Sequence, residues 1–214
     1  MSLDQAVATI EAFQGESLTT SLSSMESKVV GLSVDELDDF CSSHRIDAEF
    51  MSSALKIKKV AGQINVIIHA AGIIRSLPSL LKRGEVVQSV SLGAGNTGRR
   101  FDLETNLRVA EYKFIGWQGG SETIRQNVLF KDFFELAEHR TEKEKYLYVV
   151  GTEIPLKFFR SGRSLASVLS RRPALLATLK EKYGETLQTV GDYYKLKEQE
   201  VQICDISPHI GRNA

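Results

Sequence analysis

The spacing of hydrophobic residues changes along the chain. Through the first sixty residues it predicts short helices, and Ser33 followed three residues later by Glu36 is a capping box that opens one of them. The Ser/Thr-rich stretch Thr19–Ser27 is typical of a loop or a frayed turn. The strongly apolar run Ile64–Arg75 predicts a helix that is largely buried.

Beyond residue 84 the pattern alternates between strand and helix. Residues 85–92, 99–104, 107–115 and 145–150 are rich in β-forming residues, and residues 201–206 are a candidate last strand. Apolar residues at helical spacing between residues 124 and 139 predict a helix before the fourth strand. The order helix, three strands, helix, strand predicts an α/β fold with a mixed central sheet flanked by helices. We expect a helical N-terminal extension over residues 1–60 and an αβββαβ core with C-terminal helices over residues 61–214.

Charged residues occur within the second and third predicted strands. If Thr105 and Asn106 form a two-residue turn, Asp102 lies diagonal to Glu111 on one face of the sheet, about 7–8 Å away. Lys113 is two residues beyond Glu111 and shares its face. Two carboxylates at that distance can share a divalent ion with the lysine beside it.

An acid and a Glu-x-Lys also occur by chance in hairpins whose charged pairs line a solvated face. Here, however, Glu111 and Lys113 lie in the otherwise apolar strand Val109–Ile115. A strand that is apolar on both faces is usually central in its sheet. Charges buried there are costly unless they are paired or serve a site.

This arrangement resembles the PD-(D/E)xK nuclease superfamily over about residues 62–151. Asp102 matches the family's aspartate, Glu111 its second acid and Lys113 its lysine. Phe101 stands where the family often has proline. The apolar helix carries no family-type acid, so that role is vacant or belongs to Glu49 or Glu85.

Gln126 partly matches the Gln-x-x-x-Tyr of RecB-like members, but Thr123 and Gln126 also form a capping-box pattern. We weigh these two interpretations equally.

The resemblance implies a metal-dependent nuclease. Asp102 and Glu111 would hold Mg²⁺ or Mn²⁺, and Lys113 would act on the attacking water and on transition-state charge. The alternative is an inactive relative that binds nucleic acid or serves in assembly. His69 lies on the apolar helix, where a packed core histidine is favoured over a ligand.

Net charge is zero but unevenly distributed. Residues 1–50 hold ten acids and two bases, a net of −8, and the remainder holds seventeen acids and twenty-five bases, a net of +8. The bases either form a local basic surface that suits a phosphate backbone, or line solvated helix faces and pair with the acidic N-terminal region. If nucleic acid is bound, the sequence leaves DNA and RNA open, with DNA favoured. The candidate nucleic-acid-binding residues are Arg99, Arg100, Arg125, Lys157, Arg160 and Arg163.

The remaining features predict a cytoplasmic protein. Cys41 and Cys204 are far apart in the sequence and match no metal-ligand spacing, which is typical of reduced thiols. The first residues lack the pattern of a signal peptide. The apolar run Ile64–Ile74 is interrupted by polar residues and is too short to span a bilayer by itself, so we expect no membrane partner. A homodimer is left open.

Overall fold

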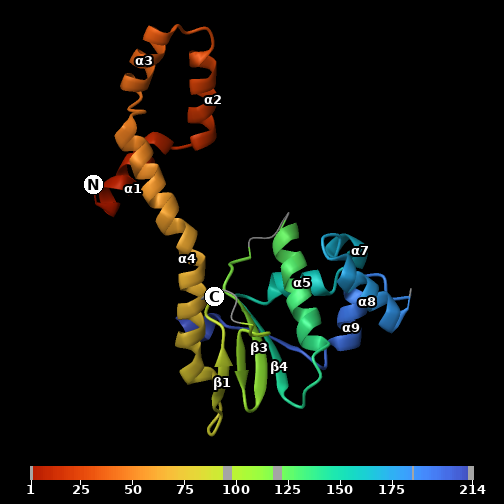
Figure 1. Ribbon diagram of the computed structural model, residues 1–214. Helices are drawn as coiled ribbons and strands as arrows, with labels where there is room; N and C mark the ends of the chain where they lie inside the picture. Colours follow the sequence, from red (N-terminus) through yellow and green to blue (C-terminus); the bar gives the residue numbers. More distant parts are fainter. Residues whose placement is uncertain (1, 94–97, 118–121, 185, 212–214) are drawn as a thin grey trace. The chain divides into compact units, whose positions relative to one another are not determined.

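Helices make up the first part of the chain in the computed structural model (Figure 1). The structure describes residues 2–93, 98–117, 122–184 and 186–211. Contacts between residues divide the chain into two units, residues 1–65 and residues 66–214.

The N-terminal unit contains α1 (Leu3–Gln14), α2 (Leu18–Val29), α3 (Val34–Ser43) and the start of α4 (Ala48–Leu80). The predicted capping box is confirmed, because Ser33 and Glu36 open α3. The loop predicted over Thr19–Ser27 is wrong. This stretch lies in α2, whose first turn is capped by the Ser17 hydroxyl, and its Leu22, Met25 and Val29 repeat at helical spacing.

Helix α4 has 33 residues and continues through Pro78 to Leu80. The expectation that Ile64–Arg75 is largely buried is wrong: Ile64, Ile67 and Ile74 are between 43% and 54% exposed. Only one side of the helix within the second unit packs against the sheet, and that side carries the fully buried Ile73. Apolar residues around the whole circumference cannot all be buried by a single neighbouring layer.

By length and composition, α4 is also a helix that could cross a membrane. Its most apolar window has a mean hydropathy of 1.3, and 11% of that window is buried. Core helices of soluble proteins can have the same length and composition. The run Ile64–Ile74 is therefore part of a helix longer than the run itself, and the expected absence of a membrane partner stays a prediction.

The second unit is built on a five-stranded mixed sheet in the order β1-β2-β3-β4-β5. Its strands are β1 (Val87–Val90), β2 (Leu103–Thr105), β3 (Arg108–Lys113), β4 (Glu144–Val149) and β5 (Gln202–Asp205). The first three strands form an antiparallel meander, and β3-β4 and β4-β5 pair in parallel. Helix α5 (Thr123–Ala137) connects β3 to β4. The predicted α/β fold with a mixed sheet flanked by helices is therefore confirmed.

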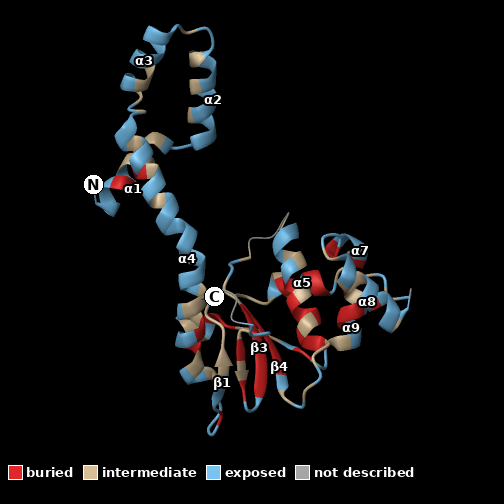
Figure 2. Cartoon of the chain, viewed as in Figure 1, coloured by how far each residue is buried: buried red, intermediate tan, exposed pale blue. Residues whose placement is uncertain are grey.

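Side chains from both faces of the sheet are buried, most densely on β3, β4 and α5 (Figure 2). On one face, Tyr112 and Tyr148 pack with Ile73 and Leu77 of α4. On the other, Val109 and Leu147 pack with α5 and with the C-terminal helices. Those helices are α6 (Glu153–Phe159), α7 (Leu165–Val168), α8 (Pro173–Tyr183) and α9 (Val190–Lys197), and the short α10 (Ser207–Ile210) follows β5. Strand β3 is central, as its sequence predicts.

The hairpin register differs from the expected one by two residues. Leu103 pairs with Ala110 and Glu104 with Val109, so the turn lies one residue later than expected. The cause is Thr105, whose hydroxyl accepts hydrogen bonds from the backbone N–H groups of residues 107 and 108. A two-residue shift keeps every side chain on its face. The same register, continued by one pair, places Asp102 directly opposite Glu111.

Candidate functional site

Asp102 directly precedes β2 and is held by two neighbours. Its Oδ2 accepts a hydrogen bond from the backbone N–H of Tyr112 at 2.9 Å, and its Oδ1 lies 3.3 Å from Nε2 of His69. Burial acts to raise the pKa of Asp102, but the hydrogen bond from His69 and the charge of Lys113 outweigh it, so the pKa is lowered. Asp102 is therefore a partly buried carboxylate that stays ionised.

The pKa of Glu111 on β3 is shifted in the opposite direction, upward. Burial, followed by the negative charge of Asp102, raises the pKa of Glu111 to about 9. Its side chain is 9% exposed, and Lys113 Nζ lies 3.4 Å from its Oε2. Burial and the hydrogen bond with the ionised Asp102 favour the protonated form of Glu111, and the charge of Lys113 opposes this only in part. Asp102 and Glu111 therefore share a site that holds one proton.

Lys113 supplies the positive charge and has a second acidic partner. Its Nζ lies 2.8 Å from Oδ2 of Asp132 on α5. Burial acts to lower the pKa of Lys113, but the charges of Asp132 and Glu111 raise it well above the ordinary value. Lys113 is therefore a fixed cation among three acids.

Asp132 and His69 belong to this cluster, although the sequence analysis did not assign them to it. The signal for Asp132 is an acid between Leu129 and Phe133 on the buried side of a helix. The signal for His69 is a polar residue within the apolar run. The sequence favoured a packed core histidine there, but His69 also contacts Asp102. His69 is 25% exposed at its side chain and lies edge-on to the ring of Phe114.

Gly72 allows Phe114 to approach α4 beside this histidine. A Cβ at Gly72 would lie 2.5 Å from the Phe114 ring, too close for any side chain to be added without movement. The glycine in the apolar run therefore has a packing role.

Gln126 is placed at the start of α5, where it pairs with an arginine. Its Oε1 accepts a hydrogen bond from Arg163. The capping-box interpretation is wrong, because α5 begins one residue earlier, at the N-cap Glu122, and has no side-chain cap hydrogen bond. Gln126 joins α5 to the loop before α7 and has no contact with Asp102, Glu111 or Lys113 among the described interactions.

The candidate phosphate-binding residues have varied surroundings. Arg100 lies beside His139 and over the Phe101 ring, and Arg125 pairs with Glu122 at 2.9 Å. Arg160 lines a cavity with Tyr194. Lys157 is on α6, and Arg99 directly precedes Arg100 on the exposed segment before β2. Arg163 is the member of this set whose partner lies on α5, the helix that carries Asp132.

Glu85, one of the two acids considered for the vacant family position, is part of another cluster. Its Oε1 and Oε2 accept hydrogen bonds from Arg108 Nε at 2.5 Å and Nη2 at 2.7 Å. Its remaining lone pairs accept from the Thr105 hydroxyl and from the backbone N–H of Lys82. Glu85 is fully occupied in a buried structural pair.

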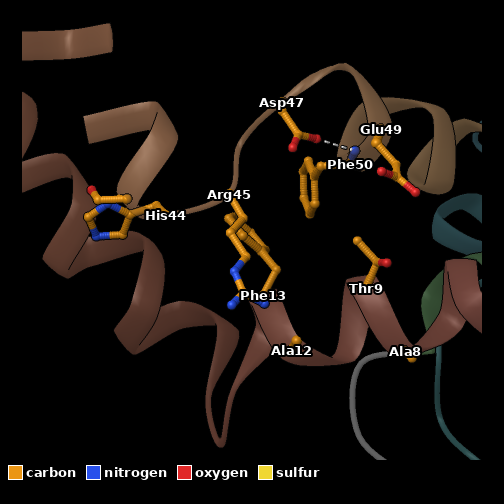
Figure 3. A pocket seen from close by; sticks show the side chains of 10 residues that line it. Ala8, Thr9, Ala12, Phe13, His44, Arg45, Asp47, Glu49 and Phe50 are labelled. Atoms are coloured by element: carbon orange, nitrogen blue, oxygen red, sulfur yellow. Dashed lines mark hydrogen bonds between the residues drawn. The ribbon is translucent and has the colours of Figure 1, made fainter. Parts of the chain in front are cut away.

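The other acid, Glu49, lines a cavity of about 540 Å³ in the N-terminal unit. Phe13 and Phe50 face each other there with ring centroids 4.7 Å apart, and Asp47 accepts a hydrogen bond from the Phe50 backbone N–H (Figure 3). Asp47 is therefore explained by helix capping rather than by a ligand.

A metal ion would be held by Asp102 and Glu111. Within the described residues, no group of three or more His, Cys, Asp or Glu side chains is arranged to hold an ion. Two hard carboxylates on opposed strand positions nevertheless suit Mg²⁺ or Mn²⁺ with water completing the coordination. The repulsion that raises the pKa of Glu111 is the kind that a divalent cation relieves.

Comparison of this chain with family models, with curated proteins and with solved structures finds no match. Functional assignment therefore depends on the site itself.

Proposed function

We propose that residues 66–214 form a metal-dependent nuclease of the PD-(D/E)xK type, acting in the cytoplasm on nucleic acid, with DNA favoured over RNA. The observation that supports this most strongly is the convergence of Asp102, Glu111 and Lys113 on a central, buried strand pair. The order of elements around them, helix, strand meander, helix, parallel strand, is the one that the resemblance implies.

The side chains would divide the work as follows. Bound Mg²⁺ or Mn²⁺ would lower the pKa of the attacking water and stabilise negative charge on the phosphate. Asp102 and Glu111 would hold that ion, and the Tyr112 backbone N–H and His69 would keep the Asp102 carboxylate in a single orientation. Lys113 would orient the attacking water and offset the charge that develops on the phosphate oxygens.

Asp132 would position Lys113 without touching the substrate. It lies 2.8 Å from the ammonium group and anchors that group to α5. A lysine fixed by a carboxylate on one side keeps its other N–H donors directed toward the site.

Basic side chains support nucleic acid as the substrate. Arg99 and Arg100 lie three and two residues before Asp102. Arg125 and Gln126, the partner of Arg163, lie at the start of α5, and Lys157 and Arg160 follow β4. Phosphate contacts of this kind position a strand without specifying its sequence.

A catalytically inactive relative is the second candidate. The observation that favours it is the short contact between Lys113 and Asp132, 2.8 Å against 3.4 Å to Glu111, which offers the lysine a purely structural partner. Such a protein would bind nucleic acid through the same basic residues and would cleave nothing.

Cleavage of labelled single-stranded and duplex DNA and RNA, with Mg²⁺, with Mn²⁺ and with EDTA, tests the proposal. We expect metal-dependent cleavage by the wild type and a loss of at least about 10²–10³-fold in Asp102→Asn, Glu111→Gln and Lys113→Met. These substitutions preserve side-chain volume, so the fold should remain. Glu142→Gln removes an exposed acid just before β4 and should cleave normally.

The outcomes separate the two candidates. Cleavage that persists in Asp102→Asn and Glu111→Gln would place the activity elsewhere or in a contaminant. If the wild type binds nucleic acid but cleaves none of these substrates with either metal, the inactive relative is the correct interpretation.

A further inference from the structure

A second cavity in the α/β unit, about 540 Å³, is lined by the start of α5 and by residues in and just after α7. Its apolar lining includes Ile124 and Val128 of α5, which are 70% and 38% exposed. Ser167 and Ser170 add hydroxyl groups to the wall. This volume is within the usual range for a small-molecule site and accommodates a single nucleotide.

Two arginines give the cavity a strong positive charge. Arg171 and Arg172 both line it, and neither guanidinium group has a hydrogen-bond or ion-pair partner among the described residues. The start of α5 adds the positive end of a helix dipole. Paired guanidinium groups with free donors are suited to bidentate contacts with phosphate.

Asn127 provides a separate indication of a ligand. It lines the same cavity, and its Oδ1 is buried without a hydrogen-bond partner among the described residues. A buried acceptor without a donor is costly, and rotation of the amide toward the cavity would let the N–H or O–H of a base or sugar complete it.

The cavity adjoins the helix side that carries the acidic cluster. Val128 precedes Asp132 by one turn, so the two residues lie on the same side of α5, about 6 Å apart along the axis. Asp132 in turn contacts Lys113. A strand with one phosphate near Lys113 could therefore place a neighbouring nucleotide in the cavity.

We propose that this cavity binds one unstacked nucleotide of the substrate strand. Arg171 and Arg172 bind its phosphate, Ile124 and Val128 pack against its base, and Asn127 accepts a hydrogen bond from it. The inference depends on the proposed function for its substrate, and it specifies the substrate class: single-stranded or locally opened nucleic acid, since bases in a continuous duplex are stacked and paired.

Binding without metal tests the cavity independently of cleavage. Fluorescence anisotropy in EDTA would compare a labelled single-stranded DNA oligonucleotide, the same strand without bases, and a blunt duplex of equal length. We expect the wild type to bind the single strand at least about tenfold more tightly than the strand without bases. The variant Arg171→Ala/Arg172→Ala should lose about tenfold or more for the single strand.

Two variants serve as controls for charge and for shape. Arg83→Ala/Arg140→Ala removes two exposed bases outside the cavity, so its loss measures the effect of net charge alone. Val128→Trp fills the cavity and leaves every charge in place. It should weaken binding of the single strand but not of the strand without bases. Circular dichroism and thermal unfolding would verify that each variant is folded.

The proposal is overturned if the two double variants lose equal affinity, if Val128→Trp binds the single strand as the wild type does, or if the wild type prefers the duplex. It stands if binding follows the expected pattern even when no cleavage is found, in which case only the hydrolytic function is lost. If the protein cleaves nucleic acid but binds the single strand, the strand without bases and the duplex equally well, the nuclease proposal stands and the nucleotide-binding role of the cavity is wrong.

Discussion

Arg108 begins β3 and Lys113 ends it, and each places a positive charge inside the same sheet. Arg108 has one acidic partner, Glu85, joined to it by two hydrogen bonds, and the two side chains are 3% and 0% exposed. Lys113 is surrounded by Asp102, Glu111 and Asp132. One end of the strand is electrically balanced, and the other has an excess of acid.

The two clusters also differ in hydrogen bonding. At Arg108, the remaining donors reach the Tyr148 hydroxyl and the Leu80 carbonyl, and the guanidinium lies over the Tyr146 ring. Such a network is complete without any other molecule. At Lys113, one carboxyl group must keep a proton, and the excess negative charge is available to a cation. This difference is why we assign structure to the first cluster and chemistry to the second.

The pH dependence of stability separates the clusters by sign. Burial acts to raise the pKa of Glu85, but the hydrogen bonds from Arg108, Lys82 and Thr105 lower it overall. Its contribution to stability is therefore present above its unfolded-state pKa and is lost as pH falls through the lowered value. Glu111, with a raised pKa, destabilises the fold progressively as pH rises.

The largest effect is expected at the balanced end. Arg108 is the only charged side chain paired with the Glu85 carboxylate among the residues that the structure describes. Arg108→Met removes it and should lower the free energy of unfolding by about 3–5 kcal/mol. Chemical denaturation monitored by circular dichroism would measure it. The double variant Glu85→Gln/Arg108→Met should recover much of the loss, because a neutral amide still accepts from Thr105. A loss below about 1 kcal/mol in Arg108→Met would mean that the pair is not the structural element described.

The next effect has the opposite sign. Glu111→Gln removes a carboxyl group that resists ionisation, so it should stabilise the fold increasingly between about pH 5 and about pH 8. The expected gain over that range is at least about 1 kcal/mol. Denaturation of both proteins at each pH, in EDTA, gives the difference directly. A difference that stays constant with pH would mean that Glu111 ionises normally and that the excess of acid is absent.

Periodicity and turn residues predicted the type and order of the elements well, because these are local properties. Strands near 85–92 and 107–115 were found as β1 and β3 with shorter bounds, and the strand near 145–150 was found as β4, one residue earlier. Alternate positions on β3 also gave Glu111 and Lys113 a common face regardless of register. Asp102 survived the error in the hairpin because a shift of two residues keeps the face.

The remaining errors concern how the helices pack on the sheet, which local sequence patterns do not reveal. The sequence shows that α4 is apolar, but not that only one side of it meets the sheet. His69 and Asp132 reach the site from two different helices, so no spacing in the sequence connects them with Asp102 or Lys113. Each still has a local sign, a polar residue within an apolar run or on a buried helical face. Such residues deserve the same weight as a motif when a site is predicted.

The smallest effect is expected at an ion pair on the surface. Its size tests whether burial is what makes the Glu85–Arg108 pair strong. Lys82 Nζ lies 2.8 and 2.7 Å from the two oxygens of Glu144, so both oxygens of this carboxylate are contacted by a cation, as both oxygens of Glu85 are contacted by Arg108. The side chains of Lys82 and Glu144, however, are 52% and 42% exposed. Lys82→Met should cost less than about 1 kcal/mol, because water screens the exposed pair, and its backbone N–H can still donate to Glu85. Denaturation at low and high salt would show a small loss that salt removes. A loss comparable with that of Arg108→Met would show that contact of a cation with both carboxylate oxygens, rather than burial, makes the Glu85–Arg108 pair strong.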